Sequence, residues 1–414
     1  MANGSAATVN YSNQPADEGL VKEVATLLKQ NIREYGMYIA LVVIIGIFTI
    51  LTGGNFMSPR NFSNLINQTG YIAVLAVGMT LILIIKHIDL SVGFVAGFTG
   101  AIAAIIMAKL SETMDMPGLA AGIAIIVVLL VGAAIGLIYG GLVAKVGVPA
   151  FVVTLAGTMI FRGLLLLVTE GTGTIIVNND IFNAIGNGYI PDIVDGNYHF
   201  LTLLIGIVTI VFAVISQVKT RANQMKYNFK VVSMPIFIMK LVFMSIVIAY
   251  IMFVLASYNG LSWTVVIVAA VVMAYSFLMN KTPLGRYIYG IGGNTQAAEL
   301  SGVNVAKVTM FAFVSMSILA GLSGILFTSR LQSAGTTAGH GFELDAIAAA
   351  YVGGTSANGG IGKVTGSIVG ALVMMSLTNG MNLMGIGVSY QYAIRGAILV
   401  AAVIFDIMTR RKKA

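Results

Sequence analysis

The chain has 414 residues, of which 58% are apolar and only 9% are charged. Soluble domains carry about 25% charged residues, so this chain cannot supply the charged shell that a soluble core of its size needs. The net charge of +8 gathers in short loops, a pattern that orients membrane spans, and we therefore expect no nucleic acid among the partners. The chain contains no cysteine, which excludes thiol catalysis.

Residues 1–36 precede the first apolar span, and we interpret them as a cytoplasmic tail. Between residues 19 and 34 apolar side chains recur at helical spacing among basic ones, which predicts an amphipathic helix lying on the membrane surface. A frayed leader is the alternative interpretation. No small-residue cleavage site precedes the apolar run that begins near Tyr38, so we expect no cleavable signal peptide.

Residues 37–409 form the predicted membrane domain, because long apolar stretches succeed one another through it and each can cross the hydrocarbon as a helix. This pattern predicts an all-α polytopic membrane protein, a helical bundle of about 10–12 transmembrane segments. The spans are expected near 37–53, 63–85, 91–108, 119–144, 149–168, 200–216, 231–256, 262–279, 308–329, 363–385 and 391–408. A shorter apolar stretch at 344–353 holds too few residues for a full crossing.

The distribution of charge predicts how these spans are oriented. With the N-terminus inside, most Lys and Arg residues fall in inner loops, including the loop at 280–307 and the basic tail at 410–414. The outer loops at 109–118 and 169–199 are acidic instead. An even number of crossings must separate the loop at 280–307 from the tail, so we predict that 344–353 crosses as a broken helix.

The apolar pattern is interrupted between Lys86 and Gly93, where His87 and Asp89 stand in the sequence Lys-His-Ile-Asp-Leu-Ser-Val-Gly. We interpret Asp89 as a cap for the next helix, because a carboxylate accepts amide hydrogens at a helix start. Contact with a solute or gate is one alternative, and a proton or ion relay is the other.

A glycine-rich run from Val352 to Gly366 contains the pair Gly362-Lys363. A phosphate-binding loop requires glycine five residues before such a pair and Ser or Thr after it, and these positions hold Ala357 and Val364. No ATP site is therefore encoded here, and the glycines suit a tight turn and close helix packing. The three histidines are scattered without metal-site spacing, so we expect this chain to bind no metal or cofactor.

The inner loop at 280–307 contains a candidate docking segment. Asn294 or Thr295 can cap a short helix, and Gly302 can end it. A short helix of this kind is a shape that docks in a groove of a partner protein. The candidate residues are Gly292, Gly293, Asn294, Thr295, Gln296, Ala297, Ala298, Glu299, Leu300, Ser301 and Gly302.

The outer loop at 169–199 is long, acidic and rich in Gly and Asn. It is either a solvated connector or a docking face for an external protein. The residues alone leave both interpretations open.

Several polar side chains lie within or beside apolar spans and are candidates for lining a polar path through the membrane. Each of them either contacts a solute or makes a hydrogen bond between helices, and the pattern leaves both interpretations open. The candidates are Asn67, Gln68, Thr80, Asp89, Ser91, Thr154, Asn358 and Asn379.

From about residue 60 to residue 408 the sequence carries a series of specific motifs in order. They are Gly78-Met79-Thr80, Ile88-Asp89-Leu90-Ser91-Val92-Gly93, Val148-Pro149-Ala150-Phe151-Val152-Val153-Thr154-Leu155, Arg162-Gly163, Thr282-Pro283-Leu284-Gly285-Arg286, Gly292-Gly293-Asn294 to Gly302-Val303-Asn304-Val305, Gly341-Phe342-Glu343-Leu344-Asp345-Ala346-Ile347-Ala348-Ala349 and Gly353-Gly354-Thr355-Ser356. With these motifs the chain resembles the inner-membrane permease subunits of bacterial ABC sugar importers, of the ribose, xylose and multiple-monosaccharide type. His87 and the extra length at about 231–279 resemble the xylose and multiple-sugar branch, whereas Lys86 departs from the small residue that the family more usually has.

The resemblance implies a fold like that of the vitamin B12 permease and a location in the cytoplasmic (inner) membrane of a bacterium, with both termini in the cytoplasm. It implies a second permease subunit, in a homodimer, and an extracytoplasmic sugar-binding protein that delivers the monosaccharide. It also implies cytoplasmic ABC ATPase subunits, which use ATP and Mg²⁺ and receive the segment Gly292–Gly302 as a coupling helix. Membrane lipid is the remaining partner.

The residues and the resemblance together predict that the chain moves a monosaccharide and makes no covalent change. An ion-coupled secondary transporter of a small polar solute is the alternative. A membrane enzyme would need convergent acids, bases or metal ligands, and the sequence pattern shows no such group.

Overall fold

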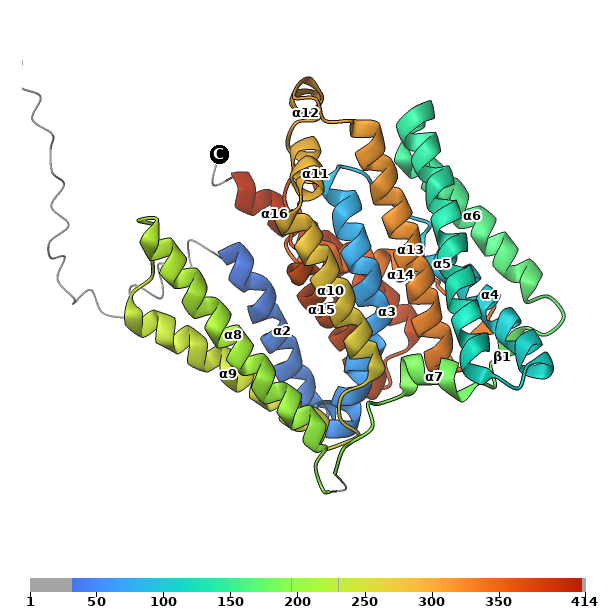
Figure 1. Ribbon diagram of the computed structural model, residues 1–414, viewed down its shortest axis with the longest axis horizontal. Helices are drawn as coiled ribbons and strands as arrows, with labels where there is room; N and C mark the ends of the chain where they lie inside the picture. The colour runs from blue at the N-terminus through green and yellow to red at the C-terminus, as the bar shows by residue number, and fades with distance from the viewer. Residues whose placement is uncertain (1–31, 195, 230, 412–414) are drawn as a thin grey trace, which may run out of the picture.

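The computed structural model describes residues 32–194, 196–229 and 231–411, and almost all of its regular structure is helical (Figure 1). Within these residues, ten helices are long and apolar enough to cross a membrane, which confirms the predicted all-α polytopic architecture. The amphipathic helix predicted at 19–34 and the basic tail at 410–414 lie almost entirely outside the described residues.

The helices and strands follow one another in this order. The first half contains α2 (Ile32–Leu51), the short turn η1 (Asn55–Met57), α3 (Pro59–Ile84), α4 (Val92–Thr113), α5 (Pro117–Gly141), the π-helical turn η2 (Leu142–Val146), α6 (Ala150–Val168), β1 (Thr174–Ile176) and α7 (Asp180–Asn187). The second half contains α8 (Phe200–Lys226), α9 (Met234–Ala256), α10 (Trp263–Lys281), α11 (Pro283–Gly293), α12 (Thr295–Leu300), α13 (Val305–Leu331), β2 (Ser333–Gly335), α14 (Phe342–Val352), α15 (Val364–Leu383) and α16 (Val388–Arg411). The two strands form one short antiparallel ladder.

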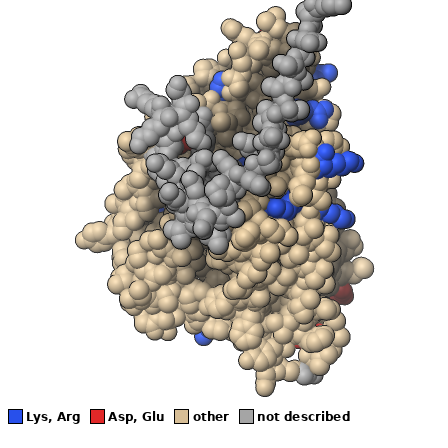
Figure 2. Space-filling view, turned by 90° about the vertical axis from the view of Figure 1, so that its left-hand side faces the viewer, with Lys and Arg blue, Asp and Glu red and all other residues tan. Residues whose placement is uncertain are grey.

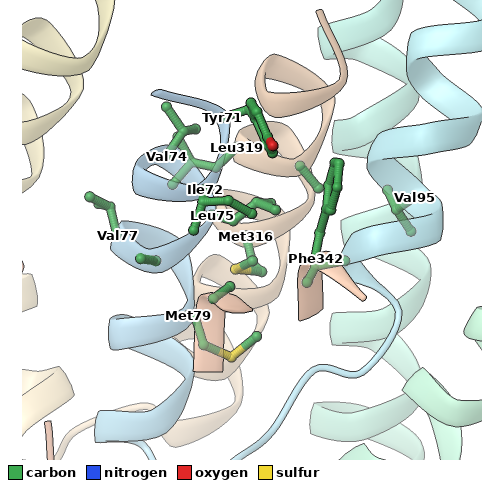
Figure 3. Close-up of a cluster of buried hydrophobic side chains, with 14 of the residues drawn as sticks. Tyr71, Ile72, Val74, Leu75, Val77, Met79, Val95, Met316, Leu319 and Phe342 are labelled. Carbon is green, nitrogen blue, oxygen red and sulfur yellow. The ribbon is translucent and has the colours of Figure 1, made fainter. Parts of the chain in front are cut away.

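The core of the bundle is built around α3 and α13, which lie side by side in the middle of Figure 1. Ile72, Leu75 and Met79 of α3 and Met316 of α13 have no exposed surface, and Figure 3 shows these side chains interleaved between the two helices. Lipid tails are as apolar as these side chains, so dispersion from close packing holds the helices together.

Glycine brings α5 and α13 into main-chain contact. Gly132, Gly136 and Gly140 recur every four residues and form one stripe of α5 that faces α13. A Cβ atom on Gly136 would lie 2.4 Å from the Cα of Val314, so no larger residue fits there without separating the helices. Stripes of small residues are the usual means of close helix approach in a membrane.

The two ends of the bundle differ. At one end, called here the α12 end, the last residue of α3 meets the last residues of α11, and α12 projects beyond them (top of Figure 1). At the other end, the α7 end, Asn61 near the start of α3 bonds Asn379 near the end of α15. In Figure 2, most of the Lys and Arg side chains that are visible lie in the upper half, toward the α12 end.

Helix α14 crosses only part of the bundle. It has 11 residues, so its length is about 16 Å, whereas the hydrocarbon layer is about 30 Å thick. Its first residue, Phe342, packs against Tyr71 near the middle of α3, with the rings tilted by 33° and their centroids 4.9 Å apart. Residues 353–363 follow it without helical structure. This arrangement agrees with the broken helix predicted from 344–353.

A second interruption lies between α3 and α4. Residues 85–91 leave the end of α3 without helical structure, and Asp89 and Ser91 are fully buried. Helix α4 then begins inside the bundle, because a Cβ atom on Gly93 would collide with Gly339 and Glu343, next to the start of α14. The backbone around Asp89 and Ser91 is therefore covered by protein, as broken backbone in a membrane must be.

Helices α8 and α9 form a hairpin at the edge of the bundle and pack mainly on each other. A small apolar cluster joins them to α3 at the α7 end, with Phe62 packed against Val254, Leu255 and Leu261. Of the two spans expected to carry extra length, α9 belongs to this hairpin, whereas α10 packs directly against α3.

Candidate functional site

The predicted short helix in the loop at 280–307 is confirmed as α12. The side chain of Asn294 accepts a hydrogen bond from the amide of Ala297 over 3.0 Å and so caps the helix. The chain leaves the helix through Gly302, whose φ of +84° is a left-handed conformation that glycine adopts without strain.

Helix α12 projects from the bundle and presents an exposed tip. Ala298 is its one buried side chain and packs beside the start of α13. Glu299 is exposed, and 91% of the Leu300 surface is open. An apolar side chain held on a short, capped and protruding helix has the geometry of a segment that enters the groove of another protein.

The base of this loop rests on the end of α3 and on the non-helical run that follows α14. The amide of Gly360, in the run after α14, donates to the carbonyl of Ile84 at the end of α3 over 2.9 Å. A Cβ atom on Gly292 would lie 1.9 Å from the same carbonyl oxygen. We call Ile84, Gly292 and Gly360 the glycine junction. Lys86 reaches across it, with its Nζ donating to the Gly293 carbonyl over 3.4 Å.

The carboxylate of Asp89 lies at the interruption between α3 and α4. Its Oδ1 accepts hydrogen bonds from the amide of Ser91 at 2.9 Å and from the Ser91 hydroxyl at 2.7 Å. Ser91 is the N-cap residue of α4. The Asp89 carboxylate therefore bonds the cap residue itself and not the amides of the first helical turn, which the sequence predicted it to cap. Its Oδ2 has no hydrogen-bond partner in the described part of the chain.

Threonine hydroxyls of α6 satisfy the backbone of this non-helical segment. Thr154 Oγ1 lies 3.4 Å from the carbonyl oxygen of Ile88, and Thr158 Oγ1 donates to the carbonyl of Leu90 over 2.8 Å. On the opposite side of the bundle, the hydroxyl of Thr80 bonds that of Ser367 and joins α3 to α15. For Thr80 and Thr154, the structure therefore shows bonds between segments, the second of the two interpretations left open by the sequence.

Two of the predicted path residues, Asn67 and Asn379, lie at the α7 end, at or near a polar cavity of about 590 Å³. Asn67 lines it, and Asn379 bonds another lining residue, Asn61. Gln68 is half-buried on α3, and Asn358 is exposed at the other end of the bundle. The cavity is lined by Asn55, Ser58, Arg60, Asn61, Asn64, Asn67, Asn187, Tyr189, Tyr258, Asn259, Arg330 and Leu383.

Most residues of this cavity were not singled out from the sequence, because they come from segments far apart in the chain. One signal was available at the start of α3, where Asn61, Asn64 and Asn67 recur every three residues along a helix and so share a broad face. A triplet of amides on one face of an apolar helix marks a polar surface even without the partners that complete it.

Hydrogen bonds hold the floor and one wall of the cavity in place. On the floor, Asn67 accepts a bond from the Ser262 hydroxyl and lies 3.4 Å from the hydroxyl of Tyr189. On the wall, the amides of Asn61 and Asn379 bond each other reciprocally at 2.9 and 3.1 Å. These contacts join α3 to α10 and α15.

The acidic loop at 169–199 is folded onto the bundle. Asp192 accepts hydrogen bonds from the amides of Phe200 and Leu201, at 2.6 and 2.9 Å, and so caps the start of α8. Desolvation acts to raise the pKa of Asp192, but bonds from the amides of Leu201, Ile193 and Phe200 outweigh it and hold the pKa below its usual value. The loop also carries α7, whose Phe182 is fully buried.

Ten candidate spans, the partial crossing α14 and a polar cavity within an apolar bundle define the class of this chain as a polytopic membrane transport protein. Residues 61–403 match the family described as the permease component of the branched-chain amino acid transport system. The chain belongs to this permease family, which confirms at the family level the resemblance drawn from its motifs.

The chain is similar to several characterised permeases over nearly its whole length. It is 36% identical to the xylose transport system permease protein XylH of Haemophilus influenzae over 382 residues, covering 92% of this chain and 98% of the relative. It is 35% identical to XylH of Escherichia coli K12 over 382 residues, with 92% and 93% covered. It is 35% identical to the ribose import permease protein RbsC of H. influenzae over 383 residues, with 92% and 95% covered.

No solved structure matches the chain. The likeness to the vitamin B12 permease that the motifs imply therefore stays a prediction.

Proposed function

We propose that this chain is the membrane permease subunit of an ATP-driven ABC importer for a monosaccharide. The observation that carries the proposal is the match to a permease family over residues 61–403, together with the xylose and ribose permeases among the relatives. The chain itself makes no covalent change, and hydrolysis of ATP with Mg²⁺ belongs to a separate subunit.

In this proposal α12 is the coupling helix and docks in a groove of the cytoplasmic ATPase. Its exposed Leu300 and Glu299 support this role, because they extend beyond the bundle at one end. The glycine junction places the same loop against the non-helical segments that follow α3 and α14. A push on α12 then reaches the segments whose backbone is least regular and whose shape is easiest to change.

We further propose that the α12 end faces the cytoplasm of a bacterium, with the chain in the inner membrane and both termini inside. The gathering of Lys and Arg toward this end supports the orientation. The α7 end then faces outward, where an extracytoplasmic sugar-binding protein delivers the solute. A second copy of the chain completes the translocation path in a homodimer. Asn67 and Asn379 stand at the outer mouth of that path.

Reconstitution into lipid vesicles tests the proposal. We expect uptake of xylose or ribose only when the ATPase and the binding protein that co-purify with the chain are both present, with ATP on the ATPase side. An uncoupler of ion gradients should leave this uptake unchanged. Uptake by the chain alone, abolished by an uncoupler, would instead identify an ion-coupled secondary transporter.

A further inference from the structure

We propose that the asparagine-lined cavity at the α7 end is a binding site for a neutral monosaccharide, so that the permease itself takes part in selecting its solute. This inference rests on the proposed function for the kind of solute. It goes beyond that function because it places recognition on this chain as well as on the protein that delivers the sugar.

The chemistry of the lining matches a polyhydroxyl ligand. Six of the twelve lining residues are asparagine, and each side-chain amide offers two N–H donors beside a carbonyl acceptor. Sugar hydroxyls both donate and accept, so this mixture suits them better than a lining of one kind. The charged residues among the twelve, all in the described part of the chain, are Arg60 and Arg330, and none of the twelve is a carboxylate. The cavity therefore does not suit a cation.

Part of the lining is held rigidly before any ligand arrives. Asn61 donates to the Phe56 carbonyl over 2.8 Å in addition to its bonds with Asn379. Asn187 donates to the carbonyl of Arg330 over 2.7 Å. The Nη2 of Arg330 donates to Asn64 Oδ1 over 2.8 Å. A site fixed in this way loses little conformational freedom when a ligand binds.

Another part of the lining is left for a ligand. The side-chain amides of Asn55 and Asn259 make no hydrogen bond with other described residues, although both line the cavity. Tyr258 is 40% exposed and meets Tyr189 edge to face, with ring centroids 6.2 Å apart. The cavity thus combines unpaired amides with an accessible aromatic ring, which offers an apolar surface to the carbon skeleton of a sugar.

Size and position agree with this assignment. A volume of about 590 Å³ falls within the range of about 300–1,000 Å³ that is usual for small-molecule pockets, and it leaves room for bridging waters around a monosaccharide. The floor is the contact of Asn67 with Ser262 at the start of α10. The cavity therefore lies at the α7 end of the packed core. In the proposed function, this is the end at which the solute is delivered.

The chain contains a built-in reporter for this site. Its single tryptophan, Trp263, follows Ser262 of the cavity floor, and its amide donates to the Gly188 carbonyl beside Tyr189. The full-length chain in lipid nanodiscs is titrated with xylose, ribose and glucuronate while tryptophan fluorescence is recorded. We expect a saturable change with a neutral pentose in the millimolar range, confirmed by calorimetry.

Asn55→Ala and Asn259→Ala should each weaken this binding by about tenfold, the loss expected for a polar contact to a ligand. Neither amide bonds another described residue, so the fold should be preserved, and an unchanged melting temperature verifies it. Asn223→Ala, an exposed amide on α8 near the α12 end, is the matched control and should bind like the parent. No response to any sugar, or binding by both cavity variants as tight as that of the parent, overturns the inference. Stronger binding of glucuronate would overturn the assignment to a neutral sugar.

The failure of this inference can be told from the failure of the proposed function. If the assembled transporter imports pentose with ATP but the permease binds none, and the cavity variants transport normally, the site is refuted and the function stands. If the permease binds pentose but the assembly shows no ATP-dependent uptake, the site stands and the function is refuted.

Discussion

Arg395 of α16 donates from Nη1 to Oδ2 of Asp345 in α14 over 2.9 Å, and both side chains are largely buried. Asp345 lies in the first turn of α14, where the helix dipole also favours a negative charge. The guanidinium of Arg395 rests over the ring of Tyr392 at 4.8 Å. The ion pair therefore fastens the partial crossing α14 to its neighbouring span.

Removing one partner of this pair should destabilise the bundle. Asp345→Asn leaves the Arg395 charge buried without compensation, which costs about 3–5 kcal/mol in comparable buried pairs. Thermal unfolding in detergent, followed by circular dichroism, measures the loss. The double variant Asp345→Leu with Arg395→Met should regain much of the stability, because it leaves no unpaired charge. A double variant no more stable than either single variant would contradict this account.

The glycine junction predicts opposite results for two adjacent residues. Gly292→Ala places a methyl group 1.9 Å from the Ile84 carbonyl oxygen, and α11 must move away from α3 to admit it. We expect this variant to insert in the membrane but to lose most of its ATP-dependent uptake. Gly293→Ala is the matched control, because a methyl group there meets nothing within 4 Å. Equal uptake by the two variants would show that the close contact has no role.

The tip of α12 predicts a partner contact. Leu300→Asp places a charge where an apolar side chain, 91% exposed, would enter a groove, and it should weaken co-purification of the ATPase by about tenfold. Tyr227→Asp, in the exposed turn between α8 and α9, is the control and should leave co-purification unchanged. Ala298 is less suitable for this test than its neighbours, since it is buried and a larger side chain would disturb the loop itself. Full recovery of the ATPase with Leu300→Asp would exclude docking through this tip.

The loop carboxylate Asp192 predicts a pH effect. Its pKa is lower in the folded chain than in the unfolded chain, so the unfolded chain binds the additional proton in acid. The contribution of Asp192 to stability is therefore present above about pH 4 and is lost as the pH falls through the lowered folded value. Melting temperatures measured across this acid range should fall less steeply for Asp192→Asn than for the parent. The control variant Asp115→Asn, which removes an exposed loop carboxylate, should show the same pH dependence as the parent. If the melting temperature of Asp192→Asn fell as steeply as that of the parent, the cause given would be contradicted.

Much of the architecture was predictable because membrane spans depend on local composition. Ten of the eleven apolar runs predicted as spans coincide with the candidate spans, whereas the run at 37–53 forms a shorter apolar helix, Gly36–Leu51, within the described residues. Asn294 and Gly302 located α12 through capping chemistry that acts within a few residues. The shortness of 344–353 likewise predicted a broken crossing, since helix length is a local property.

The features that the sequence did not reveal depend on contacts between distant segments. Asp345 and Arg395 are 50 positions apart, and no local pattern pairs them. The polar cavity draws its residues from the starts and ends of several helices, which meet only when the bundle is assembled. Thr80 and Thr154 show the same limit, because hydroxyls at a path and hydroxyls between helices look alike until their partners are known.

The contact between α5 and α13 has a mechanical consequence for the transporter. Where two helices touch through their main chains at Gly136, no flexible side chains lie between them to absorb sliding. The two helices should therefore move as a single rigid body. Because α12 leads directly into α13, a displacement of a few ångströms at the tip of α12 would tilt α5 and α13 together as one rigid body. The conformational flexibility of the protein must then lie in the non-helical segments around these two helices.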